Sequence, residues 1–167
     1  MVVGVDPPAS AEGDACGIVV CGQAEGLRLY VLADASVSGL SPEGWARTVA
    51  AAAEAWGADR VVAEKNQGGD MVASVLRAVE AGLPVKLVSA SRGKVARAEP
   101  VAARFEAGAG FFAGRFPELE DELAGLVLGG GYEPGGAAGR SPDRADAMVW
   151  AMSELLRAPR SPAVRGL

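Results

Sequence analysis

The chain contains no histidine and only two cysteines among its 167 residues. Without histidine it cannot form a Ser–His or Cys–His nucleophile pair, and it cannot hold zinc through imidazole ligands. Cys16 and Cys21 fall in one expected strand, five residues apart, so their side chains face opposite sides and cannot easily form a disulfide. Any hydrolytic chemistry must therefore rely on carboxylates, most simply on carboxylates that hold divalent metal ions.

The chain also lacks a long apolar run and a signal-peptide pattern. No stretch approaches the ~18 apolar residues of a membrane span, so no membrane association is predicted. Half of the residues are hydrophobic, which is ample for the core of one domain. We expect a domain over residues 1–157 and a flexible basic tail over 158–167, in a reducing, cytoplasmic setting.

The net charge of −5 is unevenly distributed along the chain. Residues 84–116 carry six basic and two acidic groups, a net of +4, between segments whose net charges are −6 (residues 1–83) and −3 (residues 117–167). One basic segment between two acidic ones leaves room for a local contact with a polyanion such as nucleic acid. A solvated helix face is the alternative explanation.

The order of apolar segments predicts an α/β domain. Short apolar runs joined by short linkers predict three antiparallel strands, and the alternation of helices and strands that follows predicts parallel strands with crossover helices. The expected strands are 1–6, 15–22, 27–35, 59–64, 84–88 and a short piece at 110–113; the expected helices are 42–56, 70–81, 93–107 (interrupted or kinked near Pro100), 117–124 and 141–156. Six glycines in residues 129–139 predict a mobile loop. The sheet is thus mixed, with five or slightly more strands and helices on both faces.

Two of these strands end in an acidic residue, Asp6 and Glu64. If the two strands are neighbours, their spacing of ~4.8 Å places the two carboxylates across a gap that suits a divalent ion. Carboxylates that close repel each other unless a cation lies between them. For Asp6 alone, which precedes Pro7, a turn-forming role is the alternative.

The last predicted helix adds two more acids. Asp143 and Asp146 are three residues apart, so they share a face near the helix start. Acidic side chains are favoured there in any case, which is a sufficient explanation for Asp143. Asp146 directly precedes an apolar run, where an unpaired charge would be costly. A divalent ion shared with Asp6 and Glu64 would satisfy it, and two such ions ~4 Å apart support phosphodiester hydrolysis.

The basic segment supplies candidates for phosphate contact. Lys94, Arg97 and Arg104 can project from one broad face of the 93–107 helix and meet a nucleic-acid backbone. The alternative is a helix face that simply meets solvent. Asp34, at the end of the third strand, either supports the acidic cluster from its rim or forms a turn.

Four segments together resemble the C-terminal nuclease domain of phage terminase large subunits, including prophage and gene-transfer-agent versions, from residue 2 to about 156. They are Val-Gly-Val-Asp6-Pro-Pro, Val-Ala-Glu64-Lys-Asn-Gln-Gly-Gly-Asp70, Lys94-Val-Ala-Arg97-Ala-Glu-Pro and Ser-Pro-Asp143-Arg-Ala-Asp146-Ala-Met-Val-Trp-Ala. The resemblance implies an RNase H-like fold. It also implies a metal-dependent endonuclease, using two Mg²⁺ or Mn²⁺ ions, that cuts concatemeric double-stranded DNA during genome packaging in a bacterial host cell.

The resemblance also implies roles for single residues. Asp6, Glu64 and Asp146 correspond to acidic metal ligands, Asp143 falls where relatives carry an Asp or His near the metals, and Lys94 and Arg97 match a basic segment.

Partners follow from the same resemblance. They are double-stranded DNA, the terminase ATPase domain (whose phosphate loop this chain lacks), the portal protein and the terminase small subunit. Such domains often carry a β-hairpin beside the active site, which the sequence does not locate within 108–140. Two other functions stay open: another RNase H-like nuclease, such as a Holliday-junction resolvase, and a non-catalytic module that docks on a portal or capsid protein.

Overall fold

A computed structural model describes residues 1–8, 15–65, 69–91, 93–127, 131–132 and 141–157. Its main sheet has seven strands in the order β6-β5-β1-β2-β3-β7, with β4 paired to β2. The strands are β1 (Val2–Asp6), β2 (Ala15–Ala24), β3 (Arg28–Asp34), β4 (Val37–Ser38), β5 (Arg60–Glu64), β6 (Val85–Val88) and β7 (Gly110–Phe112), with a separate pair β8 (Leu126–Val127) and β9 (Gly131–Tyr132). The helices are α1 (Pro42–Ala55), α2 (Gly69–Val79), α3 (Lys94–Glu106), α4 (Pro117–Ala124) and α5 (Asp143–Arg157), with a 3₁₀ turn at Glu25–Leu27.

Strand β1 lies in the middle of this sheet. Its valines favour extended backbone, and all five of its residues are buried. It pairs antiparallel with β2 on one side and parallel with β5 on the other. The predicted mixed sheet is confirmed: β1, β2 and β3 are antiparallel neighbours, and β5 and β6 follow in parallel.

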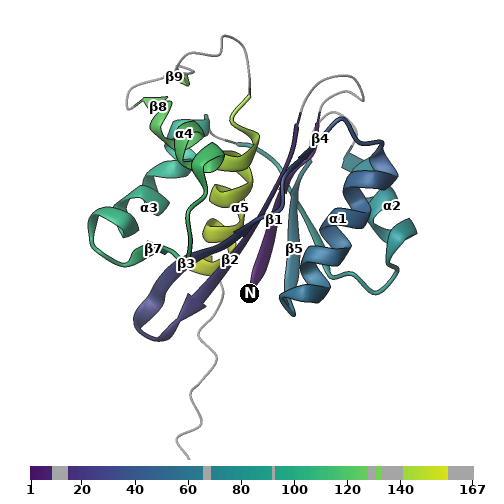
Figure 1. The fold of residues 1–167 in the computed structure, drawn as a ribbon, viewed down its shortest axis with the longest axis horizontal. Coiled ribbons are helices and arrows are strands. Elements are labelled where there is room, and N and C mark those ends of the chain that lie inside the picture. Colours follow the sequence, from purple (N-terminus) through teal and green to yellow (C-terminus); the bar gives the residue numbers. More distant parts are fainter. Residues whose placement is uncertain (9–14, 66–68, 92, 128–130, 133–140, 158–167) are drawn as a thin grey trace, which may run out of the picture.

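Helices cover both faces of the sheet. Figure 1 shows α3, α4 and α5 on one side and α1 and α2 on the other. Each face has its own apolar core: Val2 and Val62 belong to the cluster that contains α5, whereas Val3 and Val5 belong to the cluster that contains α1. Alternation along the strands therefore decides which side chains meet α5.

The two cysteines follow the same alternation. Cys16 lies in the core beneath α1 and Cys21 in the core beneath α5, and both are buried and free. Their side chains lie on opposite faces of β2 and form no disulfide, as predicted.

Helix α5 lies unusually close to the sheet because glycines stand beneath it. A Cβ atom on Gly4 would be 1.9 Å from the carbonyl oxygen of Ala147, and one on Gly17 would be 2.0 Å from that of Asp143. Both distances are far below van der Waals contact, so only glycine permits this approach. The first turn of α5, which carries Asp143 and Asp146, is therefore held directly against β1 and β2.

Several elements differ from the prediction. Helix α3 continues through Pro100, so of the two expected effects, an interruption or a kink, the interruption is absent. Strand β7 joins the main sheet in parallel with β3, and β4 adds a short pairing that the sequence did not indicate. Gly131–Tyr132, inside the predicted loop, pairs antiparallel with Leu126–Val127, which supplies a hairpin-like pair within 108–140.

Some predictions fall on other parts of the chain. The rest of the 129–139 loop and the tail 158–167 lie outside the described residues. None of the helices in the described ranges combines the length and apolar character that crossing a lipid bilayer requires.

Candidate active site

Asp6 and Glu64 end neighbouring strands on the same face of the sheet. The register pairs Val5 with Ala63, so the next residue of each strand, Asp6 and Glu64, points to the opposite face from that pair, which is the face covered by α5. Asp6 is only 6% exposed, whereas Glu64 is half-buried. The strand ends thus bring two carboxylates that are distant in sequence to one edge of the sheet.

The first turn of α5 brings two more acids to this edge. Asp143 and Asp146 are both buried, with exposed fractions of 8% and 4%. Burial and the nearby charges of Asp146, Glu64 and Asp143 raise the pKa of Asp6 from 3.8 to about 8, against an opposing effect of Lys94. The four carboxylates therefore form one electrostatically coupled cluster whose negative charge is only partly compensated.

Helix α3 supplies two positive charges that compensate part of the negative charge of the cluster. Nζ of Lys94 lies 2.6 Å from Oδ2 of Asp146, and Nη2 of Arg97 donates to Oδ1 of the same residue at 2.7 Å. Lys94 also donates to Oγ of Ser141 at 3.2 Å. Of the three residues predicted to meet phosphate, the structure brings two onto Asp146. Arg104 lies two turns further along α3, in its last turn.

Trp150 connects the α5 acids to the strand acids. Its indole Nε1 donates to Oε2 of Glu64 at 2.9 Å, and the guanidinium of Arg97 lies 4.8 Å from the centre of its ring. Trp150 was not among the residues that the sequence predicted for the site. The available signal was its position four residues after Asp146, which places both side chains on the same face of a helix.

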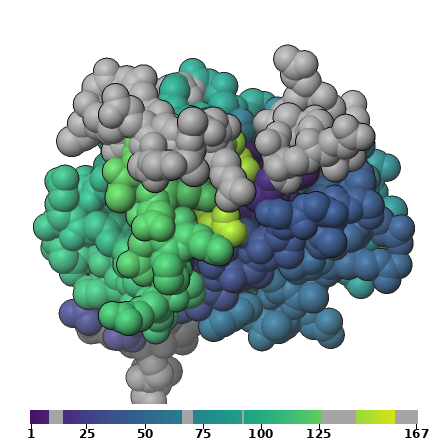
Figure 2. Space-filling view, turned by 45° about the horizontal axis from the view of Figure 1, so that its top comes forward, coloured from purple at the N-terminus to yellow at the C-terminus, as the bar shows by residue number. Residues whose placement is uncertain are grey.

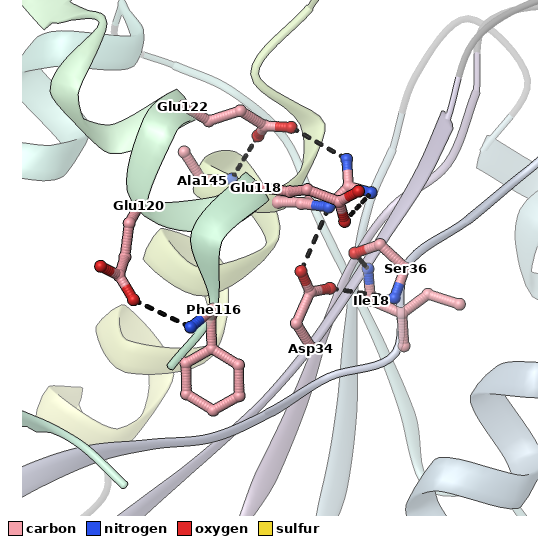
Figure 3. A network of polar contacts seen from close by, with 9 residues as sticks. Ile18, Asp34, Ser36, Phe116, Glu118, Glu120, Glu122 and Ala145 are labelled. Carbon is pink, nitrogen blue, oxygen red and sulfur yellow. Dashed lines mark hydrogen bonds and ion pairs between the residues drawn. The ribbon is translucent and has the colours of Figure 1, made fainter. Parts of the chain in front are cut away.

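A second polar network fixes the start of α5 (Figure 3). Arg144 donates to Asp34 at 3.1 Å, to Glu122 at 3.2 Å and to Glu118 at 3.0 Å. Glu122 also accepts from the backbone N–H of Ala145 at 3.0 Å, which satisfies one of the free donors at the helix start. Burial raises the pKa of Glu122 despite its contacts with Ala145 and Arg144.

Asp34 has both of the roles considered for it. One oxygen accepts from the backbone N–H of Ser36 at 3.0 Å, as in a turn, and the other accepts from Arg144. It therefore supports the first turn of α5 from the rim of the acidic cluster.

The donor set of the cluster suits a hard divalent cation, because carboxylate oxygens are the ligands that Mg²⁺ and Mn²⁺ prefer. In the described part of the chain no three acidic or thiol side chains already stand in a metal-binding arrangement. Both oxygens of Asp146 instead contact Lys94 and Arg97. The raised pKa of Asp6 indicates that the cluster still favours added positive charge.

The acidic cluster lies at the edge of the sheet where the first turn of α5 meets the strand ends. Figure 2 shows yellow atoms of the segment that contains α5 at the surface, between the green segment of α4 and the blue amino-terminal half. Most of α5 is nevertheless buried, Asp143 and Asp146 included.

Comparison with known proteins places this fold and site in context. Residues 3–155 match the family described as the terminase RNaseH-like domain. The chain is similar to the crystal structure of the large terminase nuclease from thermophilic phage G20c, with 18% identity, a TM-score of 0.62, and coverage of 92% of this chain and 81% of that chain. The cobalt-bound structure of that nuclease gives 17% identity, a TM-score of 0.64 and the same coverages, 92% and 81%.

A further similarity is to the yeast mitochondrial Holliday junction resolvase Ydc2, with 13% identity, a TM-score of 0.52, and coverage of 92% of this chain and 77% of that chain. No curated protein sequence matches the chain. At these identities the solved structures show that the fold is RNase H-like. The family match spans almost the whole domain, and this chain therefore belongs to the terminase RNase H-like domain family.

Proposed function

We propose that the chain is a metal-dependent endonuclease domain that cuts double-stranded DNA concatemers during genome packaging in a bacterial host cell. The observation that carries this proposal is the convergence of Asp6, Glu64, Asp143 and Asp146 at one edge of the sheet, in a chain of the terminase RNase H-like family. Buried carboxylates gathered in this way favour added positive charge, which divalent ions would provide.

In this proposal Asp6, Glu64 and Asp146 hold Mg²⁺ or Mn²⁺, two ions in all, and Asp143 is a fourth candidate ligand. Two such ions, when bound, activate the attacking water and stabilise the leaving oxygen of a phosphodiester. Trp150 orients Glu64 through its indole N–H, which lies 2.9 Å from the carboxylate. The bound cobalt in the phage G20c nuclease supports metal use by this fold.

A plasmid-cleavage assay with Mg²⁺ or Mn²⁺ tests the activity. We expect the wild-type chain to nick and linearise DNA, and we expect Asp6→Ala and Asp146→Ala to lower the rate at least ~100-fold, since each removes a ligand. Asp121→Ala, an exposed acid on α4, is the matched control and should cleave normally. Full cleavage by either site variant would refute the assignment.

The number of ions needs a separate measurement. Anomalous scattering from crystals grown with Mn²⁺ should give two peaks beside Asp6 and Asp146, and Asp146→Asn should remove at least one. Peaks elsewhere on the molecule would contradict this ligand set.

A Holliday-junction resolvase is the second candidate, favoured by the similarity of the fold to Ydc2. Cleavage of a four-way junction and of linear duplex of the same sequence separates the two functions. A strong preference for linear duplex is expected for a packaging nuclease, whereas a strong preference for the junction would favour the resolvase.

The proposed partners in packaging are the terminase ATPase domain, the portal protein and the terminase small subunit. If the chain instead acts as a non-catalytic docking module, it should bind portal or capsid protein in a pull-down and cleave no DNA with any divalent metal. Cleavage that depends on Asp6 excludes that alternative.

A further inference from the structure

Lys94 and Arg97 hold the position at Asp146 that a divalent ion would need. Each oxygen of that buried carboxylate lies within 2.7 Å of a cationic nitrogen, and the side chain of Arg97 is only 10% exposed. Metal–oxygen bonds are shorter, about 2.0–2.6 Å, and need the same oxygen lone pairs. An ion therefore binds Asp146 fully only when these two side chains move away.

A cavity of about 490 Å³ adjoins Arg97 between the end of β6, α3 and α5. Its lining includes Arg97 and Arg157 together with the hydroxyl groups of Ser89, Ser91 and Ser153. Its described lining residues include no carboxylate. Guanidinium and hydroxyl donors without a competing acid are the groups that bind phosphate oxygens in protein–nucleic acid contacts.

Arg97 belongs to both places, because its guanidinium contacts Asp146 and also lines this cavity. Lys94, in the first turn of α3, has a side chain that is 40% exposed and is thus free to turn outward. A phosphate in the cavity would therefore meet Arg97 directly, whereas Lys94 would reach a phosphate from the neighbouring surface.

We infer that this cavity receives a backbone phosphate of the DNA strand, and that Arg97 and Lys94 then pair with phosphate instead of Asp146. DNA binding thereby frees Asp146 for a divalent ion. This inference rests on the proposed nuclease function and deepens it, since it makes metal loading depend on substrate. Without DNA, the α3 cations occupy both oxygens of Asp146 and keep the metal affinity of the cluster low.

Coupling of this kind is reciprocal, so DNA should tighten metal binding by the same factor by which metal tightens DNA binding. Calorimetric titration of Ca²⁺ into the wild-type chain, with and without a saturating 20-base-pair duplex, measures that factor. We expect the Ca²⁺ Kd to fall about tenfold with DNA, within the range typical of coupled sites. A gel of the same samples verifies that the DNA stays intact.

Variants separate this coupling from the general attraction of cations to DNA. Without DNA, Lys94→Met and Arg97→Met should bind Ca²⁺ several-fold more tightly than the wild type. The factor by which DNA lowers their Ca²⁺ Kd should approach one. Arg97→Lys keeps the charge and provides a second test if Arg97→Met does not fold. Arg77→Met, on α2 across the sheet, is the control and should behave as wild type.

The cavity itself is tested by Arg157→Glu, which introduces a carboxylate among its donors. We expect duplex affinity to fall about tenfold while Ca²⁺ affinity without DNA stays unchanged, with Arg77→Glu as the matched control. The inference is overturned if DNA tightens Ca²⁺ binding equally in the wild type, Lys94→Met and Arg97→Met. It is also overturned if Arg157→Glu leaves the affinity for the duplex unchanged. If the chain cleaves DNA but shows no coupling, only this inference fails; if it shows coupling but never cleaves, only the proposed function fails.

Discussion

Substitution of Gly17 by alanine should disturb the acidic cluster without touching any of its side chains. The added Cβ would be 2.0 Å from the carbonyl oxygen of Asp143 and 2.4 Å from its carbonyl carbon. Ordinary contact requires about 3.5 Å, so β2 and the first turn of α5 must separate by roughly 1.5 Å. Gly17 is paired directly with Asp6 across β1 and β2, so the displacement occurs beside the strand acid.

Two effects of Gly17→Ala follow. Overpacking of this kind costs typically about 1–3 kcal/mol of the free energy of unfolding. Because the displaced turn carries Asp143 and Asp146, a misplacement of about 1 Å should also lower the cleavage rate about 100-fold.

Urea unfolding and plasmid cleavage at saturating Mn²⁺ measure the two effects of Gly17→Ala. Gly82→Ala is the control, because the nearest atom to its Cβ would be a carboxylate oxygen of Glu80 at an ordinary 3.4 Å. The reasoning is refuted if Gly17→Ala keeps both the stability and the cleavage rate of the wild type. A variant that is less stable but cleaves normally would show that the turn relaxes without moving the acids.

Three further substitutions test other parts of the site. The folded pKa of Asp6, about 8, exceeds its unfolded value of 3.8, so the metal-free protein should lose stability as pH rises from about 4 to 8. Asp6→Asn should remove that loss, which is on the order of 5 kcal/mol between pH 4 and pH 8 and is measured by urea unfolding at those two pH values. Trp150→Phe removes the hydrogen bond to Glu64 and should cost about 1 kcal/mol and slow cleavage about tenfold. The carboxylate of Glu154 pairs with Lys86 on β6 and Arg60 on β5. Burial opposes its charge, but these partners outweigh burial and lower its pKa from 4.5, so its stabilisation is present above pH ~4.5 and is lost as pH falls through the folded pKa. Glu154→Gln should therefore cost about 1–3 kcal/mol at pH 7 in thermal unfolding without changing cleavage by the folded protein.

Each of these substitutions has a contrary outcome. If the stability of Asp6→Asn depends on pH as strongly as that of the wild type, the destabilising charge does not belong to Asp6. Trp45→Phe, on the buried face of α1, controls for the loss of a buried indole. Equal cleavage defects in both tryptophan variants would show that Trp150 has no specific role in cleavage. If Glu154→Gln is as stable as the wild type at pH 7, the ion pairs of Glu154 contribute nothing to the free energy of unfolding.

The sequence predicted the strands of the site well because burial leaves a clear mark on them. The valine runs that end in Asp6 and Glu64 indicate strands buried on both faces, and adjacent parallel strands necessarily end at one edge. The two acids of α5 were recognisable from their spacing and from the apolar run that follows Asp146.

The contacts of α3 were not predictable in the same way. The sequence shows that Lys94 and Arg97 are cationic, but their partner Asp146 is 49 residues from Arg97, and only the packing of α3 on α5 brings them together. Pro100 was expected to interrupt or kink this helix, because proline lacks an N–H and crowds the preceding turn. The helix nevertheless runs without a break over Lys94–Glu106.

The glycine positions show a similar limit. A glycine within a strand signals either a bulge or a close backbone approach, and the sequence alone does not distinguish them. The structure shows that Gly4 and Gly17 permit a helix to lie on the sheet. The parallel pairing of β7 with β3 likewise depends on a long connection that local patterns do not encode.

The buried cysteines make this domain convenient for site-specific labelling. Burial raises the pKa of both thiols, and the charges of Asp6 and Asp143 add to the effect at Cys16, so almost no reactive thiolate forms at neutral pH. A cysteine introduced at exposed Ala51 on α1 would thus be the one thiol that maleimide reagents modify. A fluorophore or spin label placed there would report distances to bound DNA on the intact domain, with neither native cysteine replaced.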